Sequence, residues 1–136
     1  MTKQQVSVVG LAARCEHPGL MGQPHCHHEV EINFAEGGIA NLFGARHVQI
    51  ADGQIAVFWA ALPHRLVRVD ERVRLTWLTV SLARVLRWEL PSLLTVHLLE
   101  GHPVLGSPMD HMQNAAAMRR WLADINSGSD ALSRAV

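Results

Sequence analysis

The sequence predicts a mainly β domain, a small sandwich or barrel of short strands that is followed by helices. Three observations support this fold class. The chain has 136 residues, which is the length of one domain. As far as about Leu82, short apolar runs alternate with Gly, Pro and Asp, as they do in small β-sandwiches and barrels. Beyond Leu82 the apolar residues recur at helical spacing.

Seven runs rich in Val, Ile, Leu, Phe and Trp are predicted to be strands. They are residues 6–11, 29–34, 39–43, 47–50, 54–59, 65–69 and 73–81. Glycine, proline and aspartate separate these runs, and those residues favour turns. Between the second and third runs, Glu36-Gly37-Gly38 predicts a tight hairpin that pairs the two neighbouring strands.

Three helical segments are predicted after the strands. Residues 83–90 end at Pro91, and residues 93–99 end at Gly101. The third runs from Pro108 to about Asn126, with Ser107 as its N-cap. Its apolar residues form one stripe: Met112, Ala115, Met118, Leu122 and Ile125. Residues 129–136 are expected to begin a further helix.

The composition argues against several functional classes. Lys+Arg and Asp+Glu number 12 each, so a formal net charge of zero gives no positive surface for binding nucleic acid. The apolar runs are far shorter than the roughly 18 residues of a membrane-spanning helix. No secretory signal opens the chain, and Cys15 and Cys26 are expected to be free thiols. We therefore expect a cytoplasmic protein without a membrane contact.

Four residues are candidate metal ligands: His25, His27, Glu31 and His64. If residues 24–34 form a strand, the first three point to one face, because alternate side chains of a strand share a face. His64 follows Pro63 at the head of a later strand, which a rolled sheet would bring to the same point. Three imidazoles and a carboxylate suit a divalent transition metal: zinc, nickel, manganese or iron. The alternative is a set of structural polar residues without a metal.

These residues resemble the first motif of the cupin family. That motif reads Gly, five residues, His, one residue, His, three or four residues, Glu, six residues, Gly. The chain matches it at every position: Gly19, His25, His27, Glu31 and Gly38. The resemblance implies a small cupin jelly-roll β-barrel in residues 1–82, with the metal ligands facing its interior.

The second cupin motif is matched in part. Gly53 and His64 stand at its glycine and histidine positions. Where the motif has Pro, Gly and Asn, this chain has Trp59, Ala61 and Arg68. The second motif alone is therefore a weak signal, and the resemblance depends mainly on the first.

A wider stretch, from about His25 to Gly101, is similar to the sensor domain of AraC-type transcription regulators, in particular their melibiose-regulator branch. The similarity includes residues 57–66 (VFWAALPHRL), 77–82 (WLTVSL) and 86–91 (LRWELP). In that family a helical linker and two helix-turn-helix units follow the cupin sensor. The resemblance implies that residues 83–136 are a helical segment and the start of the linker. It also implies that DNA is bound only through a C-terminal domain missing from this chain.

The implied function is effector sensing and dimerisation without catalysis. A small molecule such as a sugar would enter the barrel near the metal, with Asn33, Trp59 and Trp77 as candidate contacts or, alternatively, as ordinary core residues. A small metal-dependent cupin enzyme, of isomerase or dioxygenase type, is the alternative function.

A homodimer is also expected, with the helix that starts at Pro108 in its interface. A small barrel has little outer surface on which to bury the apolar stripe of that helix, and two-fold dimers are the commonest oligomers. The alternative is that the helix folds back onto its own barrel.

Overall fold

The computed structural model describes residues 4–8, 11–16, 19–20, 22–23, 26–107 and 110–126. The strands are β1 (Gln4–Val8), β2 (Leu11–Glu16), β3 (Val30–Glu36), β4 (Ile39–Phe43), β5 (Arg46–Ile50), β6 (Ile55–Trp59), β7 (His64–Val69), β8 (Arg74–Val80) and β9 (Val104–Leu105). The helices are α1 (Leu82–Arg87), α2 (Ser92–Leu99) and α3 (His111–Asn126).

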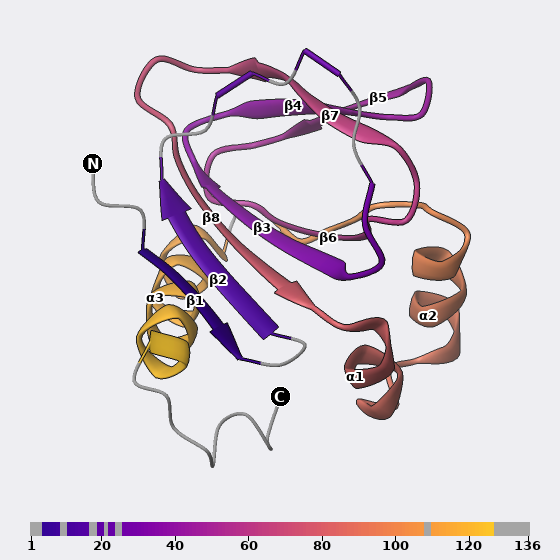
Figure 1. Ribbon diagram of the computed structural model, residues 1–136. Helices are drawn as coiled ribbons and strands as arrows, with labels where there is room; N and C mark the ends of the chain where they lie inside the picture. Colours follow the sequence, from indigo (N-terminus) through magenta and orange to yellow (C-terminus); the bar gives the residue numbers. More distant parts are fainter. Residues whose placement is uncertain are drawn as a thin grey trace.

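The strands form two antiparallel sheets (Figure 1). The larger sheet has the order β1-β2-β8-β3-β6-β9, and the smaller sheet has the order β5-β4-β7. Helix α3 packs against β1, β2 and β3, whereas α2 lies against β6 and β9. The predicted fold class, mainly β with helices after the strands, is confirmed.

The two faces of β3 pack against different partners. Val30, Ile32 and Phe34 join a core cluster that includes Ala115 and Met118 of α3, so this face lies on the helix side of the larger sheet. Residues of the opposite face alternate with these along the strand: Glu31, Asn33 and Ala35. Ala35 belongs to a second cluster, together with residues of the smaller sheet. Glu31 and Asn33 therefore point toward the space between the two sheets.

Gly37-Gly38 joins the two sheets and does not form the expected hairpin. β3 lies in the larger sheet and β4 in the smaller one, so the chain crosses between sheets at this dipeptide. Gly37 has a φ of 100°, and a Cβ there would lie 2.8 Å from Cγ2 of Val73. The Gly37 N–H donates to Oδ1 of Asp52 at 2.8 Å, which fixes the crossing.

Helix α3 packs against its own barrel. Ala115 and Met118 are 5% and 1% exposed, and Leu122 packs against the same cluster. Met112, by contrast, is 86% exposed. The expectation that this stripe is left for a second subunit is therefore wrong for its central residues, because the apolar outer face of the larger sheet needs the same cover. Pro108 and residues 129–136 lie outside the described residues.

Candidate metal centre

Three of the four predicted ligands come together at one end of the two sheets. Glu31 comes from β3 and His64 from the start of β7. His27 precedes β3, which begins at Val30 and not within the histidine motif as expected. Backbone hydrogen bonds hold this segment beside the end of β6, since the His27 N–H donates to the Ala60 carbonyl at 2.8 Å. His25 lies outside the described residues.

The ligand atoms of His27, Glu31 and His64 lie within 4.8 Å of one another. Nε2 of His27 is 3.2 Å from Oε2 of Glu31, and Nε2 of His64 is 3.7 Å from the same oxygen. A metal with bonds of about 2.1 Å places adjacent ligand atoms about 3 to 3.5 Å apart. The two nitrogens and the carboxylate oxygen therefore fit a divalent transition ion after small adjustments.

The three side chains of the site, His64, Glu31 and His27, are increasingly exposed in that order. The side chain of His64 is 3% exposed, that of Glu31 is 13% exposed, and that of His27 is 29% exposed. Phe43 and Phe58 pack around the His64 ring, with ring centroids 6.1 and 5.1 Å from it. The ion would therefore bind against an apolar wall on the His64 side and be reached from the His27 side.

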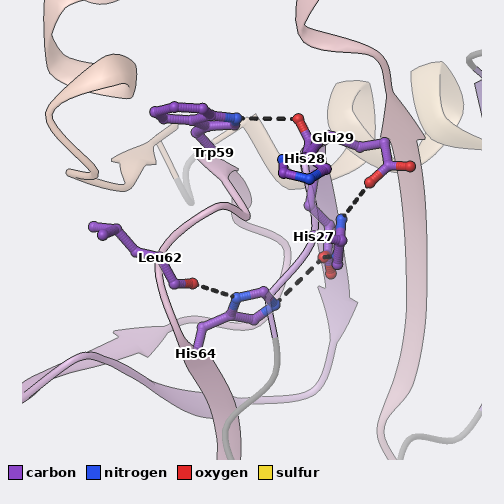
Figure 2. Close-up of polar contacts among 7 residues, drawn as sticks. His27, His28, Glu29, Trp59, Leu62 and His64 are labelled. Atoms are coloured by element: carbon purple, nitrogen blue, oxygen red, sulfur yellow. Dashed lines mark hydrogen bonds and ion pairs between the residues drawn. The ribbon is translucent and has the colours of Figure 1, made fainter.

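Each histidine is oriented by a second hydrogen bond on its other nitrogen. His64 Nδ1 donates to the Leu62 carbonyl oxygen at 3.0 Å. His27 Nδ1 donates to Oε2 of Glu29 at 2.8 Å, as Figure 2 shows. A carbonyl or carboxylate on Nδ1 leaves Nε2 as the nitrogen available for a metal. Glu29 was not among the predicted site residues, although it lies two positions from His27 and shares its parity.

The carboxylates raise the pKa of His27. The hydrogen bond with Glu31 favours the protonated imidazole, burial opposes it, and Glu29 adds to the effect of Glu31. The pKa of Glu29 is lowered: partial burial works against this direction, but hydrogen bonds from its own backbone amide and from His27 stabilise the charged form. The site thus favours positive charge between two carboxylates, as a cation-binding site does.

The structure brings together two of the three residues predicted to contact a ligand. Asn33 is 3% exposed, and its cross-strand partner on β8 is Trp77. Cross-strand partners share a face, so Trp77 points to the same side as Asn33. Trp59 lies on the opposite face from Phe58, and its indole N–H donates to the His28 carbonyl at 3.1 Å. Trp59 packs in the cluster that contains α3 residues, away from Asn33.

No family model matches the chain. The melibiose operon regulatory protein of Escherichia coli (strain K12) is 28% identical over 114 residues, which are 83% of this chain and 37% of that protein. The chain thus spans little more than a third of the length of the curated relatives that it matches.

Two solved structures are similar at low identity. Protein NMB1881 from Neisseria meningitidis is 24% identical, with 59% of this chain and 84% of that chain covered and a TM-score of 0.48. A cupin 2 conserved barrel domain protein from Salinispora arenicola CNS-205 is 20% identical, with 63% and 80% covered and a TM-score of 0.45.

Among the described residues, no helix is long and apolar enough to cross a membrane. The sequence match to the curated regulator extends along most of the chain. It confirms the resemblance to the melibiose-regulator branch of the AraC-type regulators that the stretch from about His25 to Gly101 indicates.

Proposed function

We propose that this chain is the effector-sensing cupin domain of a transcription regulator and has no catalytic activity of its own. The observation that carries the proposal is the match to a regulatory protein along 83% of this chain. The name of that protein refers to the sugar melibiose, which supports a sugar as the class of effector. The zero net charge supports a role in sensing and not in holding DNA directly.

A divalent metal ion beside the effector is part of the proposal. His27, Glu31 and His64 would hold the ion, with His25 as the expected fourth ligand. Zinc, nickel, manganese and iron all suit two or three imidazoles and a carboxylate. Bound there, the ion supplies a Lewis-acidic partner for an oxygen atom of the effector. Asn33 and Trp77 then contact the effector from the space between the sheets.

In the proposed domain organisation, residues 1–82 form the barrel. Residues 83–136 form the helical segment and the start of a linker. Support comes from β8, which ends at Val80, and from α1, which begins at Leu82. The effector would shift the helices between two arrangements and so reposition DNA-binding units outside this chain. A cytoplasmic homodimer completes the proposal.

Titration of melibiose into zinc-loaded protein, followed by calorimetry and tryptophan fluorescence, tests the sensor function. We expect saturable binding and a fluorescence change, both weakened in Trp77→Phe. Trp59→Phe is the matched control, because Trp59 packs on the opposite face and should leave the affinity unchanged. Absence of binding to the wild-type protein would contradict a sugar effector of this type.

A small metal-dependent enzyme of isomerase or dioxygenase type is the second candidate, and the donor set of His27, Glu31 and His64 favours it. The two functions differ in the fate of the bound molecule. A sensor returns melibiose unchanged after prolonged incubation with zinc- or iron-loaded protein. Conversion of the sugar, or oxygen consumption measured with an electrode, would favour the enzyme.

A further inference from the structure

Two buried asparagines, one on each sheet, face the space between the sheets. Asn33 of β3 and Asn41 of β4 are 3% and 5% exposed. Neither Oδ1 of Asn33 nor Nδ2 of Asn41 has a hydrogen-bond partner among the residues that the structure describes. A buried acceptor and a buried donor left without partners destabilise a fold, so such atoms call for an explanation. One explanation is a bound group that satisfies them.

Strand parity places both asparagines between the two sheets. Asn33 shares its face of β3 with Ala35, and Asn41 shares its face of β4 with Ile39. Ala35 and Ile39 belong to the same core cluster, which contains residues of both sheets. The two amides therefore approach that cluster from opposite sheets.

Strand register relates the two asparagines to the candidate ligands Glu31 and His64. Glu31 precedes Asn33 by two residues on the same face of β3. On the smaller sheet, His64 pairs with Phe43, which follows Asn41 by two residues on the same face of β4. Two residues of a strand span about 6.8 Å. A molecule the size of one sugar ring would therefore reach from the metal ligands to the asparagines.

The cross-strand partners of the two asparagines are uncharged. In register with Asn33 are Ala56 on β6 and Trp77 on β8. Val48 and Leu66 are the cross-strand partners of Asn41. These four partners offer no countercharge to a buried ionic group, whereas a neutral hydroxyl group costs far less to remove from water. The indole of Trp77 adds an apolar surface against which the C–H face of a sugar can pack.

We infer that Asn33 and Asn41 bind one hydroxyl group of a neutral polyhydroxylated ligand, another oxygen of which reaches the metal cluster. The inference rests on the proposed sensor function and assigns Asn41 a role in it. A hydroxyl group donates one hydrogen bond and accepts up to two. It therefore satisfies Oδ1 of Asn33 as a donor and Nδ2 of Asn41 as an acceptor. A permanently buried water would offer the same chemistry, and the experiment separates the two sources.

The experiment compares Asn33→Leu and Asn41→Leu with wild type in thermal unfolding and in melibiose titrations, both on zinc-loaded protein. Leucine keeps the branching of asparagine at Cγ and removes the polar atoms, although its side chain is larger. The matched control is Gln49→Leu on β5, since Gln49 is exposed. Without sugar, both asparagine variants should unfold at the same temperature as wild type or higher, because unsatisfied buried groups are removed. With melibiose, each should bind about tenfold more weakly.

Two results would overturn the inference. If either asparagine variant unfolds at a clearly lower temperature without sugar, the amides are structural and a permanent water or a repacked partner satisfies them. If both variants bind melibiose as tightly as wild type, the sensor function stands but the asparagines do not contact the ligand. If wild type itself fails to bind melibiose, the proposed sugar effector fails, and the sugar-free unfolding temperatures still decide the role of the asparagines.

Discussion

Two hydrogen bonds at the residue scale decide which histidine nitrogen faces Glu31. Leu62 accepts from His64 through its backbone, so this contact survives most substitutions at position 62. Glu29 accepts from His27 through its side chain, so a substitution at position 29 removes this hydrogen bond. The carboxylate of Glu29 orients the imidazole of His27, which is a proposed metal ligand, and such a contact increases the electron density on Nε2.

Glu29→Ala is expected to weaken zinc affinity by about 10- to 100-fold, because the His27 ring loses the partner that orients it. Isothermal titration of zinc into metal-free protein measures the change. Glu36→Ala is the matched control, because Glu36 is an exposed carboxylate at the end of β3. Equal zinc affinity in Glu29→Ala and Glu36→Ala would show that Glu29 does not position the metal ligand.

Metal binding is expected to weaken as pH falls, starting above the ordinary histidine pKa of about 6.5. The pKa of His27 is raised in the metal-free protein, mainly by Glu31, and a metal requires the neutral imidazole. Zinc titrations between pH 5.5 and 8 should show this loss in wild type and in His28→Ala, whose side chain is exposed. A zinc affinity independent of pH would remove His27 from the ligand set.

The stability of the metal-free fold should depend on pH in the opposite direction to the zinc affinity. A folded-state pKa above the unfolded value means that His27 stabilises the fold most below about pH 6.5. This contribution is lost as pH rises through the raised pKa. Unfolding temperatures of wild type and His27→Ala in chelator should therefore converge as the solution becomes alkaline. A difference that grows with pH would contradict the pairing of His27 with the two carboxylates.

The sequence could place Glu31 and His64 on one side of the sheets because both stand in or at the start of regular strands. Strand parity was less useful for the histidine motif, since residues 28 and 29 form a bend and β3 begins only at Val30. Glu29 shares the parity of His27, but the alternation of a strand does not indicate that its carboxylate lies 2.8 Å from Nδ1 of His27 within this bend. Likewise, the face of Trp59 depends on strand register, which only the folded sheet fixes.

At the scale of elements, local patterns predicted most strands but not their pairing. β4 was predicted with the bounds Ile39–Phe43 that it has. β2 was not predicted, because residues 11–16 (LAARCE) contain no β-branched or aromatic residue. The Gly37-Gly38 dipeptide does separate β3 from β4, but the predicted hairpin was wrong, because whether a break in the chain pairs its flanking strands or sends them to different sheets depends on long-range contacts.

Gly53 is expected to be essential for docking α3 on the barrel. Its φ is +79°, a Cβ there would collide with the ring of His111, and its carbonyl accepts from Asn114 Nδ2 at 3.0 Å. Gly53→Ala should cost about 3 kcal/mol, from backbone strain and from displacing the first turn of α3. Urea unfolding measures this loss of stability.

Gly44→Ala is the control that separates the two costs. Gly44 also has a positive φ, of +59°, but a Cβ there would meet nothing within 4 Å. Its replacement should cost only the backbone strain, about 1 kcal/mol. Equal losses of stability in Gly53→Ala and Gly44→Ala would show that the contact with His111 contributes nothing to the docking of α3.

At the scale of the whole molecule, the larger sheet is covered on both faces. Its inner face meets the smaller sheet in one cluster, and its outer face meets α3 in another. The two clusters share β3 and β8, so a ligand that moves these strands on the inner side also acts on the helix side. The packing of β3 and β8 is therefore continuous from the space between the sheets to α3.

The position of α3 changes what a charge at Leu122 should do. Leu122 packs against the outer cluster of its own chain, so Leu122→Glu places an unpaired carboxylate beside that core. We expect a stability loss on the order of 3 kcal/mol, or roughly 10 °C in Tm for a domain of this size. Leu93→Glu is the matched control, because Leu93 is 78% exposed on α2, and its Tm should stay close to that of wild type.

Light scattering on the same two variants completes the test. The proposed homodimer has twice the 15.0 kDa mass of the chain. Folded Leu122→Glu protein should keep the mass of wild type, because this side chain packs within one subunit. A Leu122→Glu protein with the wild-type Tm and half its mass would instead place α3 in the dimer interface, with its apolar stripe shared between two subunits.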